Sequence, residues 1–271
     1  MTFSTLLAQL TDTHVVAPDT DEELFADNNG RLAAAVVSLL AEDPAPEAVL
    51  ITGDLTNWGK PAEFEALVEI LGPLTVPVLA IPGNHDDRDG TRAAFPDLPW
   101  ADAEHASWVT TVGDLRILGL DSTIPRAAGA RHDEGRDLWL RESLDADHDG
   151  PTILALHHPP FVTGIDWMDA SGFEGLDRLR ATLAEYPVDR VVCGHLHRPI
   201  NASVSGIAAS VGLSTVPHVA LDLSGAQEVS LVHDPVGYQL LGWNPGGPIV
   251  SHTRYIDTDA TPFHPGWADE D

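Results

Sequence analysis

The sequence predicts an α/β fold in which strands alternate with helices, and three observations lead to this prediction. Three short apolar runs, over residues 5–10, 48–52 and 76–81, each end in a polar motif. The residues between these runs repeat their apolar side chains at helical spacing. The chain of 271 residues is 43% hydrophobic, which is enough for one large domain with a full core. Such alternation is typical of a sheet that helices cover on both faces.

The expected elements follow in chain order. Helices are predicted over 32–40 and 64–71, the second closed by a Gly-Pro stop at 72–73. Two apolar runs around Gly113-Asp114 predict a β-hairpin over 108–120. A helix over 133–147, a strand over 152–156, a helix over 176–185 and a strand over 190–193 come next, whereas 161–175 shows no clear periodicity.

After residue 200 the pattern changes to short β runs and then an acidic tail. The runs cover 207–211, 229–232, 238–243 and 249–256. There are no internal repeats and no low-complexity linkers, so we expect one domain over residues 1–271.

The charge of the chain limits its partners. The formal net charge is −28, with 42 carboxylates against 14 basic residues, of which Lys60 is the only lysine. Such a surface repels polyanions, which argues against nucleic-acid polymers and membranes as partners. An anionic substrate must therefore find strong local positive charge, and bound metal ions are able to supply it.

Cysteine content and the chain start indicate the compartment. Cys193 is the only cysteine, so no internal disulfide forms and the cytoplasm is the expected location. The weakly apolar start has no basic leader and is interpreted as a first strand. No run of 18 apolar residues is present, so no membrane-spanning helix is expected.

Five polar motifs follow strand ends, where open α/β sheets place their ligand crevices. They are Asp12-Thr13-His14, Gly53-Asp54, Gly83-Asn84-His85-Asp86, His157-His158-Pro159-Pro160 and Gly194-His195-Leu196-His197. Carboxylates, an amide oxygen and imidazoles that converge on one place are the donors that two adjacent divalent ions require.

Seven of these residues are candidate metal ligands. Asp12 and His14 are two residues apart at a tight strand exit, so both are able to face one ion, and the carboxylate of Asp54 is able to bridge two ions. His195 and His197 are expected in extended backbone, pointing the same way. The full set is Asp12, His14, Asp54, Asn84, His157, His195 and His197. With one shared donor, each ion receives four protein ligands and keeps positions open for water and substrate.

Each motif also has a simpler structural interpretation. An Asp after a Gly often forms a turn or caps a helix, and a His-x-His pair is often a surface accident. Asn-His-Asp is also compatible with an ordinary turn. Five such motifs in this order at five strand ends nevertheless favour a metal site.

His85 has a different predicted role. Next to a ligand, it is placed to contact a phosphoryl oxygen or to protonate a leaving alkoxide. The alternative is a structural histidine held by Asp86 or Asp87. We predict Asp54 and His85 as catalytic residues, and Asn84, His85 and His197 as substrate-binding residues. His158 is expected to be structural, since adjacent strand residues face opposite ways.

Together these motifs resemble the calcineurin-like metallophosphoesterase superfamily over roughly residues 5–200. The spacing from Asp12 to Asp54 to Asn84, and the stretches 84–87 and 157–160, are most similar to class III cyclic nucleotide phosphodiesterases and glycerophosphodiesterases. The resemblance implies a four-layer α/β/β/α sandwich with two mixed β-sheets, and a segment of about 200–260 that serves as a lid or oligomer contact.

The resemblance also implies a ligand set and a reaction. One ion would bind Asp12, His14, Asp54 and His197, and the other Asp54, Asn84, His157 and His195. Iron or manganese is expected, with zinc or cobalt as alternatives. A hydroxide bridging the ions would attack phosphorus in line. No phosphoenzyme is expected.

We therefore expect a hydrolase of small phosphodiesters, with 3′,5′-cyclic nucleotides first. The loop residues Trp167, Met168 and Phe173 would form an apolar wall for a base or simply pack as a lid. Alternatives are a glycerophosphodiesterase, a phosphomonoesterase, for which only Arg88 and Arg198 are candidate anion-holding arginines near the motifs, and an inactive scaffold with the same fold. A homo-oligomer is compatible with each.

Overall fold

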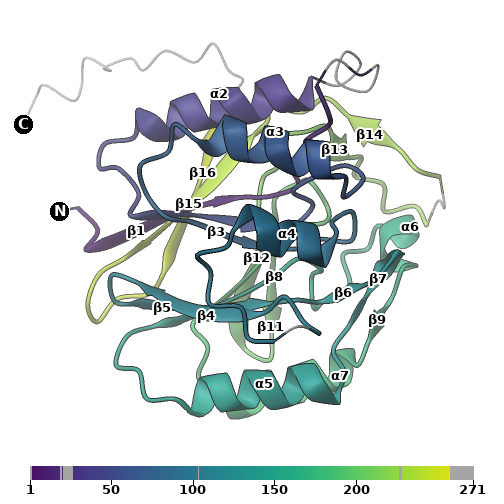
Figure 1. Cartoon of the computed structure of the whole chain (residues 1–271). Helices are drawn as coiled ribbons and strands as arrows, with labels where there is room; N and C mark the ends of the chain where they lie inside the picture. Colours follow the sequence, from purple (N-terminus) through teal and green to yellow (C-terminus); the bar gives the residue numbers. More distant parts are fainter. Residues whose placement is uncertain (1, 19, 21–26, 103, 226–227, 257–271) are drawn as a thin grey trace, which may run out of the picture.

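Two β-sheets lie face to face in the computed structural model, and helices cover the outer face of each (Figure 1). The structure describes residues 2–18, 20, 27–102, 104–225 and 228–256. Helices α2 and α3 form one outer layer, and α5 and α7 form the other. The predicted four-layer α/β/β/α sandwich is confirmed.

The first sheet is mixed. Its strand order is β16-β15-β1-β2-β3, in which β1, β2 and β3 are parallel and β15 and β16 are antiparallel to their neighbours. The bounds are β1 Thr5–Leu10, β2 Ala48–Thr52, β3 Val78–Ile81, β15 Gly237–Trp243, β16 Val250–Tyr255, α2 Asn28–Leu40 and α3 Pro61–Leu71. Both faces of β1 and β2 are buried, which explains why their sequences are continuous apolar runs.

The second sheet is mixed as well. Its order is β11-β12-β10-β8-β5-β4, with four parallel strands between two antiparallel edges. The bounds are β4 Trp108–Val112, β5 Leu115–Leu120, β8 Thr152–Leu156, β10 Arg190–Cys193, β11 Ile200–Val204, β12 Ile207–Val211, α5 Glu134–Asp145 and α7 Leu176–Glu185. The hairpin predicted around Gly113-Asp114 is β4–β5.

Side chains between the two sheets hold them in register. Trp108 on β4 is fully buried, and its indole Nε1 donates to the carbonyl of Ala80 on β3 at 2.7 Å. Gln9 on β1 donates from Nε2 to the Cys193 carbonyl of β10 at 3.0 Å. This bond joins the two sheets one strand position from Leu10 and Gly194, where the motif loops begin, so it fixes how those loops face each other.

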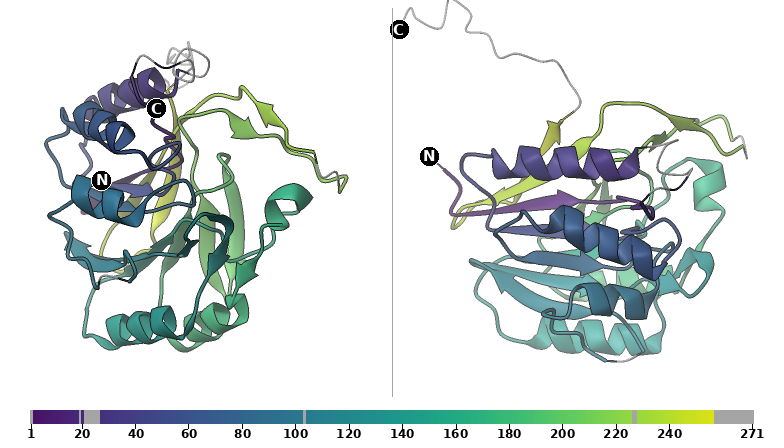
Figure 2. Two further views of the ribbon diagram at one scale, coloured as in Figure 1. Left: turned by 45° about the vertical axis from the view of Figure 1, so that its right-hand side comes forward. Right: turned by 45° about the horizontal axis from the view of Figure 1, so that its top comes forward.

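Several short elements gather at the carboxyl ends of the parallel strands (Figure 1). Figure 2 shows the β13–β14 hairpin and α6 on the same side of the molecule. Their bounds, with those of α4, are α4 Arg88–Ala94, β6 Thr123–Ile124, β7 Ala127–Arg131, α6 Asp166–Asp169, β9 Phe173–Glu174, β13 His218–Val219 and β14 Leu231–Val232. None of these was predicted as a separate element except the run that ends in β14.

The segment after residue 200 largely belongs to the two main sheets. β11 and β12 extend the second sheet, and β15 pairs with β1 in the first. Among the described residues of this segment, β13 and β14 form a separate small sheet; the lid or oligomer role predicted for about 200–260 stays a prediction, as does the single domain. The acidic tail lies outside the described residues. Among the helices described, none has the length and apolarity needed to cross a bilayer.

Candidate metal centre

The five motifs follow the carboxyl ends of β1, β2, β3, β8 and β10. Their backbone is unusual, because eight non-glycine residues of the described chain have a left-handed φ and five of these lie in the motifs: Asp12, His14, Asp54, His195 and His197. Such residues are disfavoured unless the surrounding structure enforces them, and they concentrate at functional sites. The strand exits are therefore built to aim side chains rather than to continue the chain smoothly.

Glycines allow these exits to pack closely. A Cβ on Gly83 would lie 2.2 Å from the backbone nitrogen of Asp54, and a Cβ on Gly53 would lie 2.5 Å from Nδ1 of His157. Neither position has room for a side chain, so the glycines of the two motifs are required for the approach of neighbouring loops.

The first cluster of donors comprises Asp12, His14, Asp54 and His197, whose ligand atoms lie within 4.8 Å of one another. Nε2 of His14 lies 3.1 Å from Nε2 of His197 and 3.5 Å from Oδ2 of Asp54. Oδ1 of Asp12 lies 3.6 Å from Nε2 of His197. Asp12 and Asp54 are buried, so their negative charges have little access to water.

The second cluster shares Asp54 with the first. Nε2 of His157 lies 3.3 Å from the same oxygen of Asp54, Oδ2, and 3.2 Å from Oδ1 of Asn84. The ring of His195 packs edge-on against His157 with centroids 5.1 Å apart. Asp54 Oδ2 thus lies between the two groups of histidines, as a bridging carboxylate would.

Hydrogen bonds on the far side of the rings set the tautomers. Nδ1 of His197 donates to the carbonyl of Pro217 at 2.9 Å, and Nδ1 of His157 donates to the carbonyl of Thr52 at 2.8 Å. Nδ1 of His14 lies 3.1 Å from Oδ1 of Asn57. The Nε2 atoms of His14 and His197 therefore face each other, and two facing lone pairs repel unless a cation lies between them. The donor set fits bound metal ions.

Burial and neighbouring charges shift the pKa values of these groups. Burial lowers the pKa of His14 and of His195 to about 3. Burial also works against a charged His157, but the neighbouring Asp54 and Asp12 outweigh it and raise the pKa of His157 to about 9. The pKa of Asp54 is held well below its usual value by His157 and His14 despite burial. In the apoprotein a proton on His157 thus supplies the positive charge that the second cluster favours.

The predicted extended backbone at His195 and His197 is wrong. Their φ values are 74° and 55°, so the loop turns sharply instead of continuing the strand. His197 joins the first cluster and His195 lies beside His157. The turn sends the two rings to different clusters because His195 donates its backbone N–H to the carboxylate of Asp12, at 2.9 Å from Oδ1.

His158 lies close to the second cluster, and its ligand atom is within 4.8 Å of those of His157 and His195. Both of its ring nitrogens are nevertheless engaged, Nε2 with the carbonyl of Ala128 at 3.2 Å and Nδ1 with the hydroxyl of Ser122 at 2.9 Å. Burial holds the pKa of His158 well below its usual value, so the ring is neutral. Its contacts are those of the structural residue predicted from the sequence.

His85 lies at the edge of the first cluster. Its Nδ1 donates to the carbonyl of Asn57 at 2.8 Å, and its ring lies 4.6 Å from that of His14. The structural alternative required Asp86 or Asp87 to hold the His85 ring, and neither does so. Asp86 instead accepts hydrogen bonds from the backbone of Leu55, Thr56 and Gly83. The Nε2 lone pair of His85 is left for another partner.

A cavity of about 420 Å³ opens over both clusters. Its polar floor includes His14, Asp54 and His85, and the other wall is apolar. That wall comprises Trp167, Met168, Val216, Pro217, Val219, Val229 and Leu231. The cavity has the size and mixed lining of a small-molecule site.

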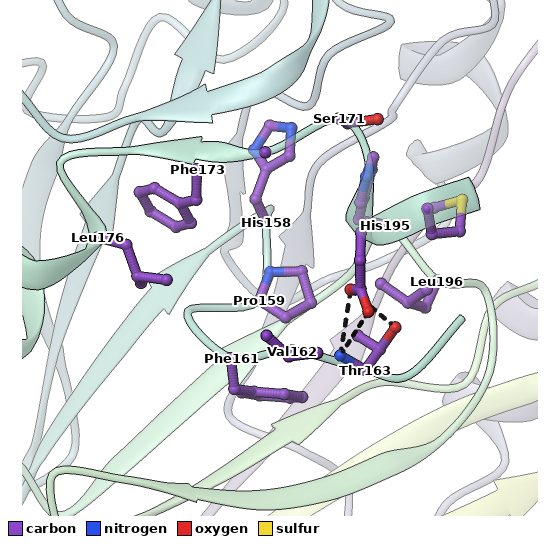
Figure 3. Close-up of a pocket in the computed structure, with 13 residues that line it drawn as sticks. His158, Pro159, Phe161, Val162, Thr163, Ser171, Phe173, Leu176, His195 and Leu196 are labelled. Carbon is purple, nitrogen blue, oxygen red and sulfur yellow. Dashed lines mark hydrogen bonds between the residues drawn. The ribbon is translucent and has the colours of Figure 1, made fainter. Parts of the chain in front are cut away.

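Phe173, the third predicted wall residue, does not line this cavity. It borders a smaller one of about 130 Å³ behind His195 and His158, together with Phe161 and Leu176 (Figure 3). There Asp169 accepts hydrogen bonds from the backbone N–H and the hydroxyl of Thr163, which ties the loop after β8 in place. Phe173 therefore packs behind the site, whereas Trp167 and Met168 face it.

Several supporting residues carry no motif in the sequence. Asn57 contacts both His14 and His85, and Ser122 contacts His158. The one sequence feature that points to Asn57 is its position in the loop directly after Asp54. The two arginines noted as anion holders are engaged elsewhere: Arg88 pairs with buried Asp121, and Arg198 donates to the carbonyl of Val219.

A family model described as calcineurin-like phosphoesterase matches residues 5–199. The chain belongs to the calcineurin-like phosphoesterase family. The expected family is thus confirmed, and with it a metal-dependent phosphodiesterase at the level of the family, with Asp/His clusters consistent with a dinuclear site.

The relatives include probable glycerophosphodiester and cyclic nucleotide phosphodiesterases. The chain is 31% identical over 261 residues to a probable glycerophosphodiester phosphodiesterase from Arcobacter nitrofigilis, covering 95% of this chain and 96% of that one. It is 32% identical to a probable cyclic nucleotide phosphodiesterase from Rhodopseudomonas palustris, covering 84% and 85%. A purple acid phosphatase from yellow lupin shares the fold, with a TM-score of 0.68 at 15% identity over 97% of this chain and 53% of that one.

Proposed function

We propose that this chain is a two-metal hydrolase of small phosphodiesters, with 3′,5′-cyclic nucleotides as its first substrate class. The observation that carries the proposal is the position of Asp54 Oδ2, which lies 3.5 Å from Nε2 of His14 and 3.3 Å from Nε2 of His157. One carboxylate oxygen between two groups of nitrogen lone pairs is suited to bridging two ions.

The proposed ligands divide between the two clusters. One ion would be held by Asp12, His14, Asp54 and His197, and the other by Asp54, Asn84, His157 and His195. Mixed nitrogen and oxygen donors suit iron or manganese, with zinc or cobalt as alternatives. When bound, the ions supply Lewis acidity and a hydroxide nucleophile at neutral pH.

The protein's own groups orient the substrate and move a proton. His85 is anchored through Nδ1, so its Nε2, once protonated, is directed to give a proton to the leaving alkoxide. Asn84, His85 and His197 border the reacting phosphate in this proposal. The apolar wall with Trp167 and Val216 gives a nucleobase a surface to pack against.

A glycerophosphodiester is the second candidate, favoured by the relative that is 31% identical over 95% of this chain. Its small polar alcohol would leave the apolar wall uncovered, which is why it ranks second. A phosphomonoester needs cations for a dianion, and Arg88 and Arg198 are engaged elsewhere. The inactive-scaffold alternative is disfavoured because all seven donor residues are present.

The proposed partners are small. With a net charge of −28, neither a nucleic-acid polymer nor a membrane surface is part of the proposal. A homo-oligomer and a cytoplasmic location remain compatible with it.

A substrate panel tests the proposal. Manganese- and iron-loaded protein is assayed with 3′,5′- and 2′,3′-cyclic nucleotides, glycerophosphodiesters, an aryl diester and the matching aryl monoester. We expect 3′,5′-cyclic nucleotides to have the highest kcat/KM and the monoester the lowest. A higher rank for glycerophosphodiesters would favour the second candidate, and inactivity of protein with two ions per chain would favour the scaffold.

A further inference from the structure

A second cavity lies beside the first at the metal centre. It has a volume of about 290 Å³ and is lined by Trp58, Asn84, His85 and Arg126, among others. His85 lines both cavities, so the two open onto the same reacting position from different sides. A phosphodiester has two ester substituents on its phosphorus. A linear phosphodiester, in contrast to a cyclic one, would place one substituent in each cavity.

Trp58 gives the second cavity a flat apolar side. Its side chain is 56% exposed, and its ring lies 6.4 Å from that of His85. The loop that carries Trp58 and Gly59 lies close to the loop that carries His85. A Cβ on Gly59 would lie only 2.9 Å from the backbone nitrogen of Asp87. Nζ of Lys60 lies 5.9 Å from the centre of the Trp58 ring. The Trp58 ring therefore lies beside His85, and the charge of Lys60 lies beside that ring.

Arg126 forms part of the same cavity. It lies in the two-residue turn between β6 and β7 with a φ of 63°, a conformation that favours glycine. Within the described part of the chain it is exposed and has no carboxylate partner. Most of the other arginines do have one: Arg88, Arg92, Arg131, Arg136, Arg141, Arg178, Arg180 and Arg254. Of the two arginines that line this cavity, Arg126 is the one without a carboxylate partner.

The carboxylates of this cavity do not neutralise Arg126. Asp86 directs both oxygens at backbone N–H groups, including those of Leu55 and Gly83, and Oδ1 of Asp87 accepts from the backbone of Gly90. Arg88, the other cation lining it, is paired with Asp121. Among the residues that line this cavity, Arg126 is therefore the cation without an ion-pair partner.

We propose that the second cavity is a subsite for an anionic substituent, a carboxylate or phosphate carried on a flat or apolar spacer. The spacer packs against Trp58 and the anion pairs with Arg126. The protein then also hydrolyses linear phosphodiesters that carry a second negative charge. This inference rests on the proposed function for the reacting phosphate, but it adds a substrate class that cyclic nucleotides, which lack such an arm, do not represent.

Matched aryl diesters test the subsite. 4-Nitrophenyl phenyl phosphate is compared with the same diester bearing a para-carboxylate or a para-phosphonate on the phenyl ring. An exposed ion pair contributes a factor of about two to five, so we expect that increase in kcat/KM for the carboxylate, mainly through KM. A larger increase for the phosphonate would identify phosphate as the preferred anion. The preference falls as salt rises, because exposed charges are screened.

Variants attribute the preference to Arg126. Arg126→Ala and Arg126→Gly should both remove it while leaving the rate on the plain phenyl diester unchanged. Arg126→Gly fits the left-handed turn, so its melting temperature should be no lower than that of the wild type. Arg131→Ala, which also removes one exposed arginine of the same small sheet, is the matched control and should keep the preference.

Two results would overturn the inference. Wild-type protein that shows no preference for either charged diester has no such subsite, whereas activity on the phenyl diester and on cyclic nucleotides would leave the proposed function intact. An equal loss on all substrates in Arg126→Ala would mean that Arg126 binds the reacting phosphate instead.

Discussion

The two donor clusters that share Asp54 differ in their readiness for a cation. In the first, the Nε2 atoms of His14 and His197 face each other at 3.1 Å, and burial lowers the pKa of His14 to about 3. In the second, Asp54 and Asp12 raise the pKa of His157 to about 9. His14 of the first cluster therefore offers a free lone pair at neutral pH, whereas His157 of the second must release a proton to bind an ion. Two sites built from similar residues are expected to differ in affinity.

The largest effect is expected from replacing Asp54, the carboxylate that both clusters share. Asp54→Asn takes away the bridging charge, so kcat/KM for a diester should fall by about 10³-fold or more. Metal content per chain, measured by elemental analysis, should fall as well. Asp147→Asn, at an exposed aspartate away from the site, should change neither quantity. Near-normal turnover by metal-loaded Asp54→Asn would reject the bridging assignment.

The next test separates the clusters. His14→Ala should lower the metal content from two ions to one by disabling the first cluster, and His195→Ala should do the same for the second. Each variant should lose most of its turnover, about 10²-fold or more, since both ions act on one phosphate. Loss of both ions in either variant, seen by elemental analysis, would contradict two separable clusters.

His85→Ala leaves both clusters in place. Turnover should fall by about 10²-fold through loss of proton transfer, with metal content unchanged. A diester with a 4-nitrophenyl leaving group, which departs without needing a proton, serves as a second readout, because its rate should fall less if His85 donates the proton. A variant that loses metal would make His85 a ligand.

The difference between the clusters predicts a pH dependence of metal binding. His157 holds its proton below its pKa of about 9, so the second ion must displace that proton and its affinity should fall with falling pH, by at most about tenfold per unit. His14 imposes no such loss above pH 3. Manganese titrations of apoprotein at pH 6, 7 and 8 should show two steps that separate as pH falls. Parallel shifts of both steps would remove the distinction.

The smallest effect is expected from replacing Ser122, whose hydroxyl contacts His158 behind the second cluster. Ser122→Ala removes the hydroxyl partner of buried His158 Nδ1, so the free energy of unfolding should fall by about 1–3 kcal/mol. Metal content should stay at two ions, since both nitrogens of His158 are engaged away from the cluster. Chemical denaturation and elemental analysis of the same samples check this, and loss of the second ion would make His158 part of the metal site.

Local patterns predicted most of the scaffold. The apolar runs before Asp12, Asp54 and Asn84 correspond to β1, β2 and β3, because a strand buried on both faces needs a continuous run of apolar side chains. The main helices were predicted as well, because the helical spacing of their apolar side chains is also a local property. The short elements β6, β9 and β13 were missed, since two residues show no measurable period, and β7 was missed because its sequence, Ala-Ala-Gly-Ala-Arg, has no large apolar side chain.

The kinds of donor and their location at strand ends were thus determined by the sequence itself, because residue type and strand periodicity are local properties. The family resemblance implied how those donors divide, but only tertiary contacts produce the division. The turn that separates His195 from His197 depends on the distant carboxylate of Asp12, and the tautomer of His197 depends on the carbonyl of Pro217. The absence of an ion pair at Arg126 likewise depends on tertiary contacts, because backbone N–H groups bind Asp86 and Asp87 and Arg88 pairs with Asp121. Contacts between residues far apart in the chain leave no trace in a local pattern.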